Sequence, residues 1–279
     1  MSTIDAVQQS YASSAAAVRP TFGPEHAQAQ AYYARYVDYV LAHVRVSPAS
    51  ILDVGCGTGW STLMFHRAGH RAHGVDLHQN GLEAWQEFSE LPYTLADAQS
   101  LPFPDESFDV VSMYQMLEHV PNPKLALEEA IRVLRPGGRL VVVGPNLIGA
   151  GYTLYWALRH TAQCLRHGKL WDARTPEMPH HPGGNTMSEL WFSTTKHLGW
   201  TLKKMLIEKK THFRTREPDP QPPFYGDNDA CYYCTPLDLL NWAKATGLAR
   251  AVCWWATDRP LARWIWPFTS GTWVVLEKR

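Results

Sequence analysis

The chain has 279 residues, enough to bury a full hydrophobic core as one elaborated domain or as a domain with a lid. Its 26 Lys and Arg residues balance its 26 Asp and Glu residues, which excludes a surface-wide attraction to nucleic acid or to an anionic membrane. Five scattered cysteines favour reduced thiols and a cytoplasmic location. Residues 1–18 hold no Lys or Arg, so we expect no secretory signal, and no run reaches the ~18 apolar residues of a membrane span, so we expect no membrane partner.

Residues 1–24 are rich in Ala, Ser and Gln, and we expect them to form a flexible segment. From residue 25 to residue 44, large side chains recur every three to four positions, which predicts a helix. The residues that carry this spacing are Tyr32, Tyr36, Tyr39, Val40 and His43.

The stretch from Ile51 to Trp60 predicts a buried parallel strand, a tight turn and the start of a helix. The apolar strand ends near Asp53, and the helix is expected over residues 61–68. Three glycines alternate through the turn between them: Gly55, Gly57 and Gly59. Glycine permits positive φ and lets a ligand lie against bare backbone, while the helix N-terminus supplies N–H donors.

This G-x-G-x-G turn, with an acid two residues before it, resembles the class I S-adenosylmethionine (SAM)-dependent methyltransferases. In that family the turn holds the methionyl end of the cofactor, and the acid that matches Asp53 helps to bind its ammonium group. The resemblance assigns four residues of the turn to the cofactor: Gly55, Cys56, Gly57 and Gly59. It also implies a helix before the first strand, with aromatic residues near the cofactor. The candidates for these aromatic residues are Tyr11, Tyr32 and Tyr33. The alternative is that their rings serve only in packing of the helix face.

A second strand is expected over residues 70–77, closing on Asp76. An acid at the carboxyl end of this strand is positioned to accept hydrogen bonds from both ribose hydroxyls of a nucleoside. We therefore assign Asp76 and the adjacent Leu77 to the cofactor, with a simple turn residue as the alternative interpretation of the acid.

A helix over residues 82–88 and a short strand over residues 93–96 lead to Asp97. The string from Leu101 to Val111 follows and resembles a specific segment of the same family. The resemblance implies that the carboxylate of Asp97 accepts from the adenine amino group and that the backbone of Ala98 reaches the ring.

The fourth strand begins at Phe108 and leads into residues 112–120. Because ligands of open α/β sheets lie beyond the carboxyl ends of the strands, Tyr114 is expected beside the sulfonium and Gln115 beside the acceptor. His119 matches a family position in a Glu-His-Val setting, where it either acts in catalysis or braces the loop.

Asn122 and Pro123 predict a capped helix that turns Leu125, Ile131 and Leu134 inward, followed by a fifth strand over residues 139–144. Further along, Thr235 and Asp238 predict a variant capping box on a helix that stops at Gly247. The last two strands are expected over residues 248–257 and 272–278. Alternation up to about residue 146 predicts a parallel sheet. The resemblance implies an α/β fold, a Rossmann-like seven-stranded, mostly parallel sheet with helices on both faces and an antiparallel last strand.

Residues 147–234 interrupt this alternation as a helical insertion, which we expect to form a substrate-binding lid between core segments 25–146 and 235–279. Helices are expected over residues 152–166 and 194–209. Leu198, Leu202, Met205 and Leu206 share one face of the second helix. The insertion supplies a catalytic candidate, His181, and three substrate-binding candidates: His180, Trp191 and Tyr225. Cys231 and Cys234 have the spacing of zinc ligands, but a single pair of this kind favours strand or core, so no metal is expected.

The resemblance implies an enzyme that moves a methyl group from SAM to an oxygen, nitrogen or sulfur atom of a small aromatic or apolar metabolite, leaving S-adenosylhomocysteine. Two alternatives stay open. The first is an RNA methyltransferase that uses the basic segment 196–216 against phosphate, although no nucleic-acid partner is expected; the second is a SAM-binding scaffold without chemistry. We expect a monomer or a homodimer.

Overall fold

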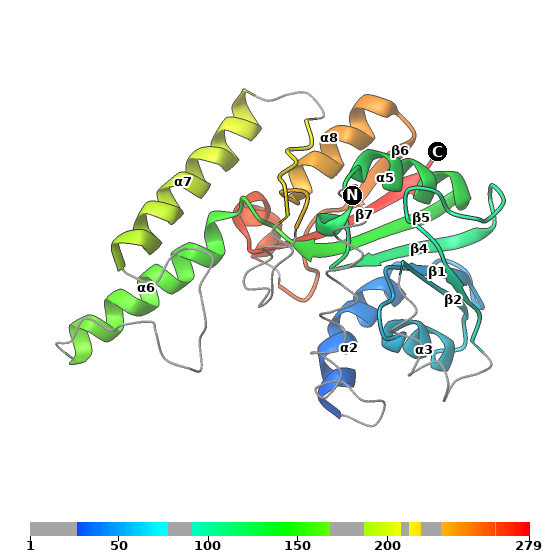
Figure 1. Cartoon of the computed structure of the whole chain (residues 1–279). Helices are drawn as coiled ribbons and strands as arrows, with labels where there is room; N and C mark the ends of the chain where they lie inside the picture. Colours follow the sequence, from blue (N-terminus) through cyan, green and yellow to red (C-terminus); the bar gives the residue numbers. More distant parts are fainter. Residues whose placement is uncertain (1–26, 78–90, 168–186, 208–211, 219–229, 260) are drawn as a thin grey trace.

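The computed structural model describes residues 27–77, 91–167, 187–207, 212–218, 230–259 and 261–279 (Figure 1). The strands are β1 (Ser50–Val54), β2 (Arg71–Asp76), β3 (Tyr93–Leu95), β4 (Phe108–Tyr114), β5 (Leu134–Pro145), β6 (Ala249–Cys253) and β7 (Gly271–Lys278). The helices are α2 (Ala27–Leu41), α3 (Trp60–Arg67), α5 (Pro123–Val133), α6 (Ala150–His167), α7 (Met187–Leu206), α8 (Pro236–Thr246) and α9 (Ala262–Ile265), with 3-10 turns η3 (Leu117–His119) and η4 (Trp266–Phe268).

The strands form one seven-stranded sheet in the order β3-β2-β1-β4-β5-β7-β6. Strands β1 to β5 pair in parallel, whereas β7 runs antiparallel between β5 and β6. This arrangement confirms the predicted fold class. The chain order reverses between β1 and β4, and ligands of such sheets bind beyond the carboxyl ends of the strands at that point.

Alternating side chains of the central strands fill a core on each face of the sheet. On one face, Leu52 and Val111 pack with residues of α5 and α8; on the other face, Ile51 and Val110 pack with residues of α2 and α3 (Figure 1). Because both faces are covered, the central strands are mostly apolar, as expected for a parallel sheet. Burial of both faces fixes the register of the strands and therefore the positions at which they end.

Helix α5 corrects one sequence-based expectation. Asn122 caps the helix as predicted, since its side-chain oxygen accepts from the backbone N–H of Leu125 at 3.4 Å. Leu125 itself is exposed, so its predicted inward position is wrong, and Leu134 belongs to β5 rather than to the helix. The buried stripe lies one position further along and contains Ala126, Leu127, Ala130 and Ile131.

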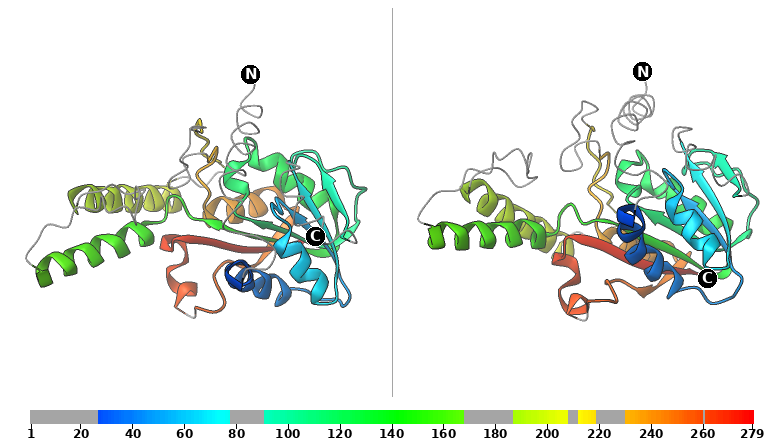
Figure 2. Two further views of the ribbon diagram at one scale, coloured as in Figure 1. Left: turned by 60° about the horizontal axis from the view of Figure 1, so that its bottom comes forward. Right: turned by 90° about the horizontal axis from the view of Figure 1, so that it is seen from below.

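Within the insertion, α6 and α7 pack against each other as a helical hairpin that projects from the sheet domain (Figures 1 and 2). Helix α7 begins at Met187, seven residues before the predicted start at residue 194. None of the described helices combines the length and the apolar character that a membrane crossing requires.

A buried ion pair connects the hairpin to the core. Lys204 of α7 and Asp238 of α8 form the pair, and both side chains are almost fully buried. The hydroxyl of Tyr232 donates to the same carboxylate at 2.7 Å, and the ammonium of Lys204 also donates to the carbonyl of His212 at 2.9 Å. Burial raises the pKa of Asp238 to about 6, against the attraction of Lys204. The predicted capping box is wrong because Thr235 makes no side-chain cap and Asp238 binds Lys204 instead.

Asp238→Asn should lower the free energy of unfolding by about 3–5 kcal/mol, because it leaves the buried ammonium of Lys204 without a counter-charge. Urea unfolding measures this change. The double variant Lys204→Met, Asp238→Leu should recover most of the loss, since it removes both charges. A single variant that loses less than about 1 kcal/mol would show that the pair does not anchor the hairpin.

Candidate functional site

The glycine turn adopts the backbone that its sequence predicts. Gly55, Gly57 and Gly59 have φ values of 71°, 51° and 80°, which side-chain-bearing residues rarely adopt. A Cβ on Gly55 would lie 2.6 Å from the side chain of Met116, so this glycine is required by packing. A Cβ on Gly57 would meet no atom within 4 Å. The turn therefore presents bare backbone on its open side at Gly57.

Asp76 holds this turn from the neighbouring strand. It ends β2, and its carboxylate accepts from the backbone N–H of Gly57 at 2.8 Å. The N–H groups of Gly55 and Cys56 donate to the carbonyl of Val75 at 2.8 and 3.1 Å. Asp76 thus lies at the carboxyl end of the second strand, directly against the glycine turn, and Leu77 follows it.

Asp53 lies beneath the turn at the centre of a hydroxyl cluster. Its side chain is almost fully buried, and burial raises its pKa while hydrogen bonds from hydroxyls oppose that effect. The four donors come from α2, α3 and β4: Tyr36 at 3.3 Å, Ser61 at 2.6 Å, Thr62 at 2.7 Å and Ser112 at 3.0 Å. A direct contact with a cofactor ammonium requires one hydroxyl to give way, so the predicted ammonium role of Asp53 stays a prediction.

Sequence reasoning missed this hydroxyl cluster. One available signal was Ser112, a polar residue within the apolar run of β4, since a buried hydroxyl requires a partner. The other was the pair of hydroxyl residues in the first turn of α3, directly after the glycines.

The adenine candidates lie in the loop after β3. The carboxylate of Asp97 accepts from the backbone N–H of Gln99 at 2.8 Å and from its side-chain amide at 3.0 and 3.1 Å. The amide oxygen of Gln99 accepts from the backbone N–H of Asn122 at 3.1 Å, which connects this loop to the start of α5. Ala98 is buried beside them. The role of Asp97 and Ala98 toward adenine stays a prediction.

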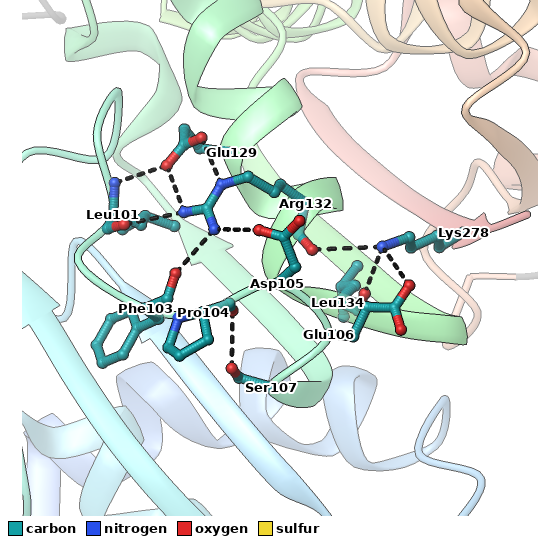
Figure 3. A network of polar contacts seen from close by, with 10 residues as sticks. All are labelled: Leu101, Phe103, Pro104, Asp105, Glu106, Ser107, Glu129, Arg132, Leu134 and Lys278. Carbon is teal, nitrogen blue, oxygen red and sulfur yellow. Dashed lines mark hydrogen bonds and ion pairs between the residues drawn. The ribbon is translucent and has the colours of Figure 1, made fainter.

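Arg132 fixes the string that follows, as Figure 3 shows. Its guanidinium donates to the carbonyls of Leu101 and Phe103 at 2.9 and 2.8 Å, and it pairs with Asp105 and Glu129. The carboxylate of Glu129 also accepts from the N–H of Leu101 at 2.8 Å. The family-specific string is therefore a loop held by one arginine on α5, next to the predicted adenine residues.

Four tyrosines gather where β4 ends. Tyr36 stacks on Tyr114 with ring centroids 4.3 Å apart, and Tyr32 and Tyr33 meet the same ring edge-on at 5.8 and 5.6 Å. Burial raises the pKa of Tyr33 to about 12, and its ring packs against the cluster that contains Cys56 of the glycine turn and Trp60. Burial also raises the pKa of Tyr114. The tyrosines of α2 thus contact the end of β4 and lie beside the glycine turn. Tyr11 lies outside the described residues.

The segment after β4 holds two further candidates. Gln115 is exposed and has φ 50°, an uncommon conformation for a side-chain-bearing residue, and its N–H donates to the carbonyl of Val143 at 2.8 Å. The imidazole Nε2 of His119 lies 3.7 Å from the buried carboxylate of Glu118. The carbonyl of Glu118 accepts from the N–H of Cys231 at 2.7 Å, which ties the end of the insertion to this segment.

Of the four candidate residues on the insertion, Trp191 alone lies within the described part of the chain. The indole N–H of Trp191 donates to the hydroxyl of Thr161 at 3.4 Å and so joins α7 to α6. His180, His181 and Tyr225 lie outside the described residues. Cys231 and Cys234 are buried and form no disulfide. Within the described ranges, no group of three or more His, Cys, Asp or Glu residues is placed to hold a metal ion.

Gly57→Val should abolish binding of S-adenosylhomocysteine, because its side chain occupies the open side of the turn. Gly69→Val is the matched control: Gly69 has φ 89°, and a Cβ there also meets no atom within 4 Å. Both variants should lose at least about 1–2 kcal/mol of unfolding free energy through backbone strain. Calorimetry should detect binding for the control alone. Equal binding by both variants would contradict a ligand-facing turn.

Comparisons with known proteins agree with this geometry. A family model described as "Methyltransferase domain" matches residues 52–142. Over 104 residues the chain is 39% identical to phthiotriol/phenolphthiotriol dimycocerosates methyltransferase 1 of Mycobacterium ulcerans, a match covering 36% of this chain and 38% of that protein. Over 96 residues it is 42% identical to the demethylmenaquinone methyltransferase of Tropheryma whipplei, covering 33% and 40%. The chain thus spans about two-fifths of the length of these curated relatives.

Among solved structures, an S-adenosylmethionine-dependent methyltransferase from Mesorhizobium loti is similar over nearly its whole length. The TM-score is 0.54, the identity is 17%, and the match covers 88% of this chain and 98% of that one. At this identity the likeness concerns the fold alone. Residues 52–142 thus match a methyltransferase domain, and together with the glycine turn and the sheet order these findings support the resemblance to the class I S-adenosylmethionine-dependent methyltransferases.

Proposed function

We propose that this protein transfers a methyl group from SAM to an oxygen, nitrogen or sulfur atom of a small aromatic or apolar metabolite. The observation that carries the proposal is the tyrosine cluster of Tyr32, Tyr33, Tyr36 and Tyr114 beside the glycine turn. Tyr33 connects the tyrosine cluster to the turn by packing against the cluster that contains Cys56 and Trp60, so aromatic surface adjoins the backbone that the methionyl end of SAM would contact. Aromatic walls suit an apolar acceptor.

The tyrosines serve this reaction as walls rather than as bases. The pKa of Tyr33 is raised to about 12 and that of Tyr114 is raised as well, so both phenols keep their protons at neutral pH. Ring faces attract a cation such as a sulfonium. Methyl transfer from a sulfonium is an in-line displacement with a neutral leaving group, so its main demands are alignment of the acceptor and exclusion of water.

Four groups would hold the cofactor. Asp76 would accept the ribose hydroxyls, with its bond to Gly57 fixing the carboxylate in place. Asp97 and the backbone of Ala98 would contact adenine. For Asp53 we propose an indirect role: its buried carboxylate organises the turn through hydroxyl donors and places negative charge beneath the ammonium group.

For an acceptor with a poorly acidic hydroxyl we propose His119 as the proton acceptor, oriented by the Glu118 carboxylate 3.7 Å away. Gln115 would orient the acceptor from the end of β4. The insertion remains the proposed lid, with His180, His181, Trp191 and Tyr225 as its candidate contacts. The reaction would occur in the cytoplasm, where the free buried thiols of Cys56, Cys231, Cys234 and Cys253 stay reduced.

The names of the two relatives, a demethylmenaquinone methyltransferase and a phthiotriol dimycocerosates methyltransferase, add support for a small-molecule acceptor. The RNA alternative receives less support from its basic segment. Lys204 is buried in an ion pair, and the guanidinium of Arg214 lies over the rings of Trp200 and Tyr233 at 4.7 and 5.4 Å. These cations therefore serve the packing of the insertion.

His119→Ala should lower methyl transfer about 100-fold or more for a hydroxyl acceptor, since a positioned general base contributes that much. The assay uses methyl-labelled SAM with a panel of quinols and phenols and follows label in the organic phase. Affinity for S-adenosylhomocysteine should not change, and His66→Ala, an exposed histidine of α3, should keep full turnover. Wild-type protein that binds S-adenosylhomocysteine but labels no acceptor would favour the scaffold alternative. Full turnover by His119→Ala would contradict the role of His119 as the general base.

A further inference from the structure

The α6–α7 hairpin exposes many large apolar side chains, which an ordinary pair of surface helices would bury. On α6, Leu158 is 53% exposed and Leu165 is 83% exposed, whereas Thr153 is buried. On α7, Phe192 and Leu206 are 70% and 69% exposed, whereas the buried positions are polar. Among the described side chains, the hairpin thus exposes large apolar residues and buries only alanine, threonine and lysine, although surface helices normally bury their apolar stripe.

The outward apolar residues form one stripe on each helix, which we call the apolar face. At 100° per residue, the exposed residues of α6 fall within about a third of its circumference, and those of α7 within a similar arc. The members on α6 are Leu154, Tyr155, Leu158 and Leu165, and those on α7 are Phe192, Leu198, Leu202, Met205 and Leu206. Figure 2 shows that the hairpin projects from the domain in both views, so the sheet domain does not cover its outer part.

The inward side of α7 explains why this face cannot turn toward the core. Thr201 donates from its hydroxyl to the carbonyl of Ile148 at 2.8 Å, and Lys204 pairs with Asp238. Rotating the helix to bury its leucines would break both contacts and leave a buried carboxylate alone. The orientation is therefore fixed by buried polar bonds, and the apolar face stays outward.

The charges beside the apolar face indicate what covers it. Arg166, Lys196 and Lys203 are exposed at its borders. Glu189 is the only acidic residue in the sequences of the two helices. A second copy seated on this face would bring these cations against one another, which disfavours a symmetric dimer. Apolar stripes bordered by Lys and Arg are typical of helices that lie in the plane of an anionic lipid surface.

We propose that the α6–α7 hairpin docks on an anionic membrane surface. Its apolar face would enter the boundary between headgroups and acyl chains, and the bordering cations would contact lipid phosphates. This proposal departs from the sequence-based expectation of no membrane partner, which rested on the balanced net charge of the chain and on the lack of a segment able to span.

Vesicle flotation tests the proposal without cofactor or acceptor, so its outcome is independent of the proposed chemistry. Wild-type protein should float with vesicles of equal parts phosphatidylglycerol and phosphatidylcholine, and much less with phosphatidylcholine alone. The double variant Leu202→Glu, Leu206→Glu should lower the bound fraction at least about tenfold, because it removes apolar area and adds negative charge. Leu248→Glu, at an exposed leucine outside the hairpin, is the matched control and should float like wild type.

Thermal unfolding followed by circular dichroism should be the same for the double variant and the control, since all three leucines are exposed. Three results would overturn the proposal. Wild-type protein fails to float with anionic vesicles at low salt, or the double variant floats as well as wild type. Alternatively, sedimentation shows a dimer that the same double variant converts to monomer, in which case the apolar face joins two copies of the chain.

Discussion

The structure of the site depends on one buried carboxylate. Asp53 is the next-to-last residue of β1 and lies in the interior, where burying a charge is costly unless donors surround it. Tyr36 of α2, Ser61 and Thr62 of α3 and Ser112 of β4 supply those donors. These hydrogen bonds to a single carboxylate fix α2, α3 and β4 relative to β1. The glycine turn lies directly above this cluster, so its positive-φ backbone is set before any ligand arrives.

A similar arrangement holds the other half of the site. Arg132 joins the carbonyls of Leu101 and Phe103 to the carboxylates of Asp105 and Glu129, so the loop beside Asp97 is fixed from α5. Both networks lie behind the surface that would contact the cofactor. The surface residues themselves, such as Asp76 and Gly57, then need only local bonds to keep their positions. Such preorganisation lowers the cost of ordering groups when the ligand binds.

Local sequence signals predicted much of this arrangement. They failed for side chains whose partners or direction depend on contacts with distant parts of the chain. The strands, the positive φ of Gly57 and the Asn122 cap were predicted because each depends on neighbouring residues. Asp238 looked like a capping acid, but its partner Lys204 lies 34 positions earlier and pairs with it only in the folded chain. The spacing of Leu198, Leu202 and Leu206 gave one helix face correctly, yet periodicity cannot tell whether a face points to the core or away from it.

The most direct test of the account is calorimetric titration of S-adenosylhomocysteine into wild-type protein and Asp76→Ala. The account predicts binding by wild type and a loss of about 1.5–3 kcal/mol in the variant, because a charged acceptor for the ribose hydroxyls is removed. Asp76→Asn, which keeps an acceptor for the N–H of Gly57, should lose less. Glu128→Ala, at an exposed acid of α5 outside the turn and both networks, should bind like wild type. Unchanged affinity in Asp76→Ala would contradict the ribose assignment and with it the placement of the cofactor.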